Sequence, residues 1–220
     1  MVAYRKLIVL MSLLAVLTSC EGIFGGIYDE PVTDQDSRFS HIEENADGKS
    51  GTIYVDAHAY DRWTYIDLHH KTIDTSNIVL GQSAPHDWDF ALHRYDAKTN
   101  NGSVAETMLD NVNFIDGRFN FAELAFYADV DSHVVIDMSN MMSGTLEYAP
   151  SDVNPVLSRW MDVDLSQMPP IYTMSGRVYL AQFADSTLAA LQFVNYMNES
   201  FAKGYITIRY RYPVNKVGKN

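Results

Sequence analysis

The chain has 220 residues, 47% of them hydrophobic, and a single cysteine. This apolar content excludes a largely disordered protein, and one thiol excludes a fold held by internal disulfide bonds. Asp and Glu number 28 against 16 Lys and Arg, a formal charge of −12. That balance disfavours nucleic acid and anionic lipid as partners, because both are bound by clustered basic side chains.

The first twenty residues have the pattern of an export signal. Basic Arg5 and Lys6 precede the apolar run Leu7–Leu17, which is too short to span a bilayer comfortably. Thr18-Ser19-Cys20 follows at once, as in bacterial lipoproteins. We therefore expect residues 1–19 to be a lipoprotein signal peptide and Cys20 to carry the acyl chains, palmitate among them. The alternative is an ordinary signal peptide beside an unrelated thiol.

Residues 20–50 are expected to form a lipidated flexible tether. Gly22, Gly25 and Gly26 loosen the chain, Pro31 interrupts it, and the stretch Asp29–Glu44 is acidic with few apolar residues. Removal of the signal leaves 14 basic and 28 acidic residues, a formal charge of −14. Such acidity is explained by the solubility of an exported protein.

From residue 51 onward, segments with alternating apolar and polar residues follow one another, which predicts β-strands. Turn residues such as Asn101-Gly102 and Asp116-Gly117 separate them. The expected strands are Thr52–Asp56, Trp63–Leu68, Asp87–Arg94, Arg118–Phe126, His133–Met138, Thr145–Ala149, Arg177–Ala184, Leu188–Met197 and Tyr205–Tyr212.

We therefore predict an all-β fold, a single domain over residues 51–213 with a short tail at 214–220. Two packed antiparallel or mixed sheets are expected, or an open barrel, because no window has a helical apolar stripe of three turns. Trp88, Phe90 and Leu92 should share one strand face, with Asp87, Asp89, Ala91 and His93 on the other.

Methionines are concentrated in the second half of the chain. Eight follow the signal, and six of these fall between residues 138 and 174, partly in polar surroundings. A thioether is a soft, neutral ligand for haem iron or cuprous copper, and it is also a flexible filler of apolar cores. Packing explains Met161 and Met197 well; it explains Met138, Met141 and Met142 less well.

The histidines give no support to a catalytic metal site. The spacing is neither His-x-His nor His-Glu-x-x-His, and neighbouring His69 and His70 would point to opposite sides of a strand. No serine elbow or phosphate-binding glycine loop occurs either, so the sequence does not support an enzyme. Fourteen tyrosines and three tryptophans suit a flat apolar ligand, although strand propensity alone favours them as well.

Several stretches together resemble the HmuY-like family of haem-binding bacterial lipoproteins. The resemblance spans roughly residues 50–213, together with the lipidation motif, and its motifs occur in the expected order. The stretches that carry it are Trp63–Leu68, Asp87–Arg94, Lys98–Gly102, Val178–Leu180, Phe193–Tyr196 and Gly204–Tyr210.

The resemblance implies a non-enzymatic haem carrier at the outer membrane, surface-exposed or shed. Members take haem (iron protoporphyrin IX) from host haemoproteins and pass it to a TonB-dependent outer-membrane receptor. Two histidines of the second half hold the iron in the founding member, and two methionines appear to do so in others. After residue 93 this chain keeps only His133, so methionine ligation is expected here.

The resemblance places the ligands in two segments of the chain. One is expected from Met138, Met141 or Met142, and the other from Met168 or Met174. Within these sets, Met141 and Met168 are the expected iron ligands. The alternatives are a structural or adhesive surface lipoprotein that binds no haem, because a fold does not fix a function, and a carrier of another flat apolar ligand.

Overall fold

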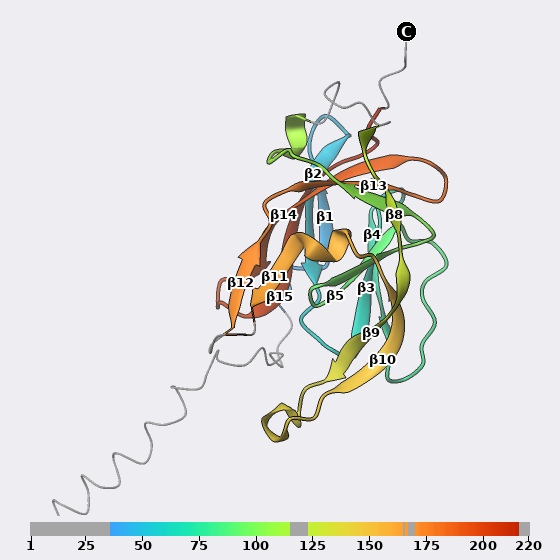
Figure 1. Ribbon diagram of the computed structural model, residues 1–220. Coiled ribbons are helices and arrows are strands. Elements are labelled where there is room, and N and C mark those ends of the chain that lie inside the picture. The colour runs from blue at the N-terminus through green and yellow to red at the C-terminus, as the bar shows by residue number, and fades with distance from the viewer. Residues whose placement is uncertain (1–35, 115–122, 165, 167–169, 216–220) are drawn as a thin grey trace, which may run out of the picture. The chain divides into compact units, whose positions relative to one another are not determined.

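The computed structural model describes residues 36–114, 123–164, 166 and 170–215. The seven-stranded sheet, the four-stranded sheet and the separate two-stranded hairpin described below all lie in one compact unit, within Pro31–Asp162 and Tyr172–Asn220. Regular structure in the described residues consists of strands and short 3-10 helices, so the all-β prediction is confirmed (Figure 1).

The larger sheet has seven strands in the order β1-β2-β15-β14-β13-β7-β8, and every neighbouring pair is antiparallel. Strand β15 follows β2 by some hundred and fifty residues in sequence, as estimated from their bounds, yet it lies directly beside it (Figure 1). The strands are β1 (His41–Glu44), β2 (Ser50–Asp56), β7 (Ser103–Glu106), β8 (Tyr127–Ala128), β13 (Val178–Gln182), β14 (Leu188–Met197) and β15 (Lys203–Arg211).

The smaller sheet has four strands in the order β4-β3-β5-β6, and a separate hairpin pairs β9 with β10. These strands are β3 (Arg62–Asp67), β4 (Thr72–Asn77), β5 (Phe90–His93), β6 (Asp96–Thr99), β9 (Val130–Asp137) and β10 (Glu147–Val153). The remaining elements are β11 (Met161–Asp164), β12 (Ile171–Met174) and the 3-10 helices η1 (Val112–Phe114), η3 (Met141–Ser143) and η4 (Leu157–Trp160).

The alternation expected in the last strand is present in β15. Ile206, Ile208 and Tyr210 are fully buried, whereas Arg209 between them is exposed. Ile208 pairs with Ile53 of β2, so apolar side chains of both strands point into the same core. The prediction succeeds here because one face of the strand is apolar over its whole length.

Strand β5 differs from the prediction in length and in pattern. It covers Phe90–His93 instead of Asp87–Arg94, and it is buried on both faces. Asp89 lies just before the strand instead of within it. Its carboxylate accepts a hydrogen bond from the backbone N–H of Leu68. Of the four residues expected on the face opposite Phe90, three (Asp89, Ala91 and His93) are buried and Asp87 is exposed.

Two further stretches differ from expectation or lie partly outside the described residues. Residues 41–44, inside the range predicted as a tether, form β1 and pair with β2. Residues 123–126, the described end of the predicted strand Arg118–Phe126, are not in a strand, and residues 115–122 lie outside the described part.

Candidate functional site

Met138 and Met141 lie on the turn that connects β9 with β10, at the tip of that hairpin (Figure 1). We call residues 138–144 the methionine turn. The backbone N–H of Met141 donates to the carbonyl of Met138 at 2.9 Å, and the N–H of Gly144 donates to the carbonyl of Met141 at 2.9 Å. Gly144 has a positive φ of 78°, which favours glycine at the end of this short helix. Both methionine side chains are partly exposed, and most residues around them in the sequence are polar.

The hairpin that carries the methionine turn is fixed by an apolar cluster. Val134 of β9 is 1% exposed and packs with Trp63, Tyr65 and Ala91 of the four-stranded sheet. Half-buried Trp88, together with apolar residues of the hairpin, covers this cluster. Burial of these side chains therefore positions the base of the hairpin, while its tip projects beyond the cluster.

Met174 ends strand β12 and is half-buried. The backbone N–H of the next residue, Ser175, donates to the carbonyl of Trp160 at 2.9 Å. Trp160 is fully buried and stacks on Phe193 at a centroid distance of 4.4 Å, so this end of β12 is held by the core. Met168 lies outside the described residues, as does the side chain of Met142.

The strand that carries Met174 also carries Tyr172, whose ring contacts two further tyrosines. Tyr172 stacks on Tyr196 with ring centroids 5.9 Å apart, and it contacts Tyr95 at 5.5 Å. The ammonium of Lys203 lies 4.0 Å from the centre of the Tyr172 ring. Half-buried aromatic rings beside a thioether are the kind of surface that holds a flat apolar molecule.

The buried histidines already have partners in the protein. His93 is 1% exposed and lies 2.7 Å from the carbonyl of Tyr60, and His58 is hydrogen-bonded to Asp56 and stacked on Tyr205. His133, the one histidine of the second half, is exposed on β9. Met161 is buried, which agrees with the packing role expected of it.

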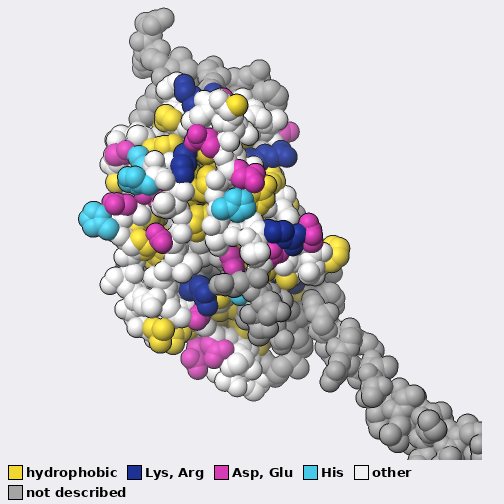
Figure 2. Space-filling view, turned by 180° about the vertical axis from the view of Figure 1, so that it is seen from behind, with side chains coloured by type: hydrophobic (Ala, Val, Ile, Leu, Met, Phe, Trp, Pro, Cys, Tyr) yellow, Lys and Arg dark blue, Asp and Glu magenta, His cyan; other side chains and the backbone are white. Residues whose placement is uncertain are grey.

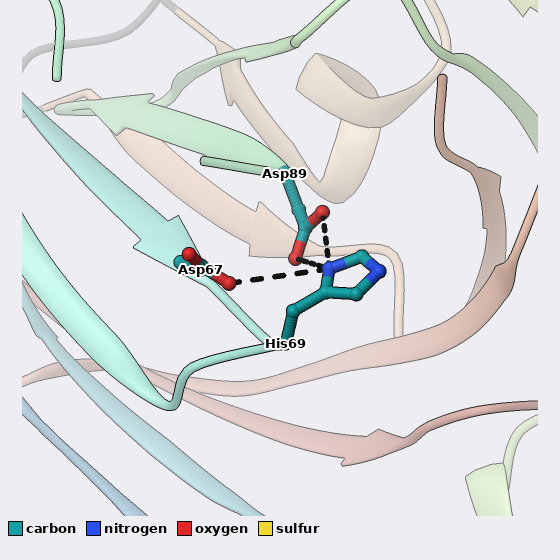
Figure 3. Close-up of side chains that lie close together, drawn as sticks. All are labelled: Asp67, His69 and Asp89. Carbon is teal, nitrogen blue, oxygen red and sulfur yellow. Dashed lines mark hydrogen bonds and ion pairs between the residues drawn. The ribbon is translucent and has the colours of Figure 1, made fainter. Parts of the chain in front are cut away.

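A second group of side chains that reasoning from the sequence missed lies where β3 and β5 meet. Ile66 pairs with Phe90 in antiparallel register, so the next residue, Asp67, lies opposite the preceding residue, Asp89. The Nδ1 atom of His69 is 3.0 Å from Oδ1 of Asp89 and 3.9 Å from Oδ1 of Asp67 (Figure 3). We call Asp67, His69 and Asp89 the aspartate–histidine cluster.

The cluster shifts the pKa values of all three members, those of Asp89 and His69 upward and that of Asp67 downward. Burial raises the pKa of Asp89, which is only partly offset by the Leu68 N–H and by His69. Burial also acts to raise the pKa of Asp67, but its hydrogen bonds with His70 outweigh burial and leave that pKa lowered. Burial opposes protonation of His69, yet the hydrogen bond with Asp185 and the charge of Asp89 prevail and raise its pKa.

The aspartate–histidine cluster opens into a surface pocket of about 220 Å³. His86, Asp87, Asn100 and Asp185 line the pocket beside the cluster. Over the face drawn in Figure 2, histidine and acidic side chains lie near one another, and Lys and Arg are scattered instead of gathered into a basic patch.

The sequence places two members of this cluster close together but gives no indication of the third. Asp67 and His69 are two residues apart at the end of a predicted strand, but Asp89 comes from the next paired strand. No short motif connects residues twenty positions apart. His69 and His70 lie beyond the end of β3, and both contact Asp67, so the expectation that they face opposite sides of a strand does not apply.

The export signal and the lipidation residue Cys20 lie outside the described residues. Within the described ranges, none of the helices has the length and apolar character needed to cross a bilayer.

Comparison with known proteins agrees with this fold. The model of the family described as HmuY protein matches residues 59–210. A crystal structure from Bacteroides vulgatus, described provisionally as an HmuY-like haem-binding protein, is 42% identical with a TM-score of 0.76 over 81% of this chain and 100% of that one. A Bacteroides fragilis protein, described provisionally as a lipoprotein, is 41% identical with a TM-score of 0.76 over 83% and 100%.

Apo PinO from Porphyromonas gingivitis has the same fold at 24% identity, with a TM-score of 0.66 over 74% of this chain and 96% of that one. The comparison with curated proteins gives no match. The strands and their order thus define an all-β protein of the HmuY-like class. The chain belongs to the HmuY family.

Proposed function

We propose that this protein is a haem-binding surface lipoprotein that captures haem and delivers it to an outer-membrane receptor. Membership of the HmuY family supports haem as the cargo, as does the 42% identical neighbour described provisionally as haem-binding. The observation that carries the proposal is the methionine turn, where Met138 and Met141 sit half-buried at the tip of a hairpin otherwise rich in polar residues. Packing alone does not require thioethers there.

The proposed iron ligands are two thioether sulfurs. One comes from the methionine turn, from Met138, Met141 or Met142, and the other from Met168 or Met174, with Met141 and Met168 as the preferred pair. Thioethers are soft and neutral, so they suit haem iron and favour its reduced state. The tyrosines beside Met174 would hold the flat ring, and bound haem would supply the iron that the receptor delivers to the cell.

The remaining parts of the proposal concern location and partners. Lipid on Cys20 would hold the protein at the outer membrane, exposed or shed. Host haemoproteins would supply the cargo, and a TonB-dependent receptor would accept it. In this role the protein acts as a carrier and is not an enzyme, so affinity for haem and its release are the properties that matter.

Haemin titration of the purified protein tests the proposal. We expect a Soret band that saturates at one haem per chain and a loss of affinity of roughly tenfold or more when both segments are changed, as in Met141→Ala with Met168→Ala. Met108→Ala is the matched control, because Met108 is 81% exposed and lies outside both segments. Absence of a Soret band would leave a lipid-tethered scaffold without this cargo.

The pH dependence distinguishes the two kinds of ligand. Histidine must lose its proton to bind iron and has an ordinary pKa of about 6.5, whereas a thioether does not titrate near neutrality. We expect the haem complex to persist at about pH 5.5, where ligation by histidine fails. Loss of the band through about pH 6–7, together with loss of binding in His133→Ala, would contradict methionine ligation.

A further inference from the structure

We propose that the aspartate–histidine cluster binds a divalent transition-metal ion, with zinc as the probe, at a site independent of the haem ligands. One ligand atom from each of Asp67, His69 and Asp89 lies within 4.8 Å of the others. Zinc binds imidazole nitrogen and carboxylate oxygen at about 2.0–2.2 Å, which places its ligand atoms roughly 3–4 Å apart. The separations of 3.0 and 3.9 Å from Nδ1 of His69 fall in that range.

The strand pairing brings two buried carboxylates together, which favours a cation at this point. Asp67 and Asp89 face each other across an antiparallel pair, and their side chains are only 6% and 7% exposed. Like charges directly opposite each other destabilise a sheet, and buried carboxylates require a compensating charge. The imidazole of His69, with 36% of its side chain exposed, supplies at most one positive charge at the opening of the pocket.

The groups around the cluster have the arrangement that metal ligands usually have. The other ring nitrogen of His69, Nε2, lies 2.9 Å from Oδ2 of Asp185, and histidine ligands commonly donate their second N–H to a carboxylate. Asp67 is oriented by His70, whose Nδ1 lies 2.6 Å from Oδ2. The Leu68 N–H holds Oδ2 of Asp89 at 2.6 Å, so all three ligand groups have a second partner.

The pocket offers both access and further ligands. It opens to solvent beside the cluster, and its wall contributes Asp87 and Asp185, which together with Asp67 and Asp89 place four carboxylates around one space. Water can complete the coordination of an ion that enters there. One imidazole with carboxylates favours zinc or manganese over calcium, which takes oxygen ligands alone.

Isothermal titration of the chelator-treated, haem-free protein with zinc chloride tests this site. We expect one ion per chain in the unchanged protein and at least a roughly hundredfold weaker Kd in His69→Gln and in Asp89→Asn. Asp185→Asn, which changes only the second partner of His69, should weaken binding roughly tenfold. Asp89→Asn keeps an oxygen for the Leu68 N–H, so the variant retains that contact.

Two matched controls separate this site from surface binding. His41→Gln changes an exposed histidine on β1, and His133→Gln changes an exposed histidine on β9; neither lines the pocket. Both should keep the Kd within about twofold. Undetectable zinc binding, or unchanged affinity in both His69→Gln and Asp89→Asn, would overturn the proposal.

Three further measurements support the interpretation. Thermal unfolding shows whether each variant is folded, and cobalt added in place of zinc gives a visible spectrum that must disappear in His69→Gln if the imidazole is a ligand. Haemin affinity in Asp89→Asn should remain unchanged. Failure of the metal site is therefore distinguishable from failure of the haem proposal, because each has its own variants and its own signal.

Discussion

At the scale of one residue, burial of Lys98 among aromatic rings changes the pKa of its ammonium group. Its ammonium lies 4.1 Å from the centre of the Trp63 ring, 5.3 Å from that of Tyr65 and 5.7 Å from that of Trp88. Burial lowers the pKa of Lys98 to about 8, against the pull of Asp152 and Asp129. The rings attract the charge, but they do not replace the water that it has lost.

This lowered pKa predicts how stability depends on pH. The unfolded chain, with a lysine pKa of about 10.4, binds more protons than the native protein between about pH 8 and 10.5, so this residue makes the protein more stable as pH rises through that window. We expect the free energy of unfolding of the unchanged protein, relative to Lys98→Met, to increase by about 2 kcal/mol between about pH 7.5 and 10.

Urea unfolding at several pH values measures this difference. Lys49→Met is the matched control, because Lys49 is exposed, and its difference from the unchanged protein should stay constant. A constant difference for Lys98→Met as well would show that burial does not penalise the charge of Lys98.

At the scale of elements, the hairpin of β9 and β10 contributes both to the stability of the fold and to the candidate haem site. Its apolar side chains pack on the four-stranded sheet, while the methionine turn lies at its tip. A change in that packing should therefore affect stability and haem affinity together, even though no proposed iron ligand is altered.

We expect Val134→Ala to lower the free energy of unfolding by about 1–3 kcal/mol, because it opens a cavity under the hairpin. Val130→Ala is the matched control on the same strand, since Val130 is 50% exposed, and it should change stability by less than about 0.5 kcal/mol. Denaturant unfolding and haemin titration measure the two effects. Equal effects of the two substitutions would contradict the assigned role of the cluster.

Strands with one apolar face were predictable from the sequence, and strands without one were not. Leu188–Met197 was predicted with its observed bounds, and Tyr205–Tyr212 was displaced by only one or two residues, because apolar residues fill or alternate along both. Strand β4 is mostly exposed and polar, so no apolar pattern indicates it. Short β6 and β7 were missed because four residues are too few to establish a period.

The two candidate sites also differ in how far the sequence indicates them. The methionine turn could be proposed as a site from the sequence because its three methionines lie within five residues of one another. The aspartate–histidine cluster was not, because it forms only when the registers of β3 and β5 bring Asp67 opposite Asp89. Pairing between strands is tertiary information, and a single sequence does not contain the register explicitly.

At the scale of the whole molecule, the proposed attachment to a membrane depends on one atom, the sulfur of Cys20. The chain carries an excess of acidic residues, so its charge does not favour binding to anionic lipid. We therefore expect Cys20→Ala to move the protein from the membrane fraction to the soluble fraction of cells that express it, while haem affinity of the purified protein is unchanged. Immunoblots of the separated fractions measure this, and membrane retention of Cys20→Ala would show that another segment is the anchor.

The place of β15 in the larger sheet affects the order in which the protein can assemble. β2 meets β14 only through this strand, so β1 and β2 are not joined to the rest of the larger sheet until residues of β15 have been synthesised. Contacts between such distant residues close slowly. For the export proposed above, this delay would keep the two edges of the sheet apart while the unfolded chain crosses the membrane.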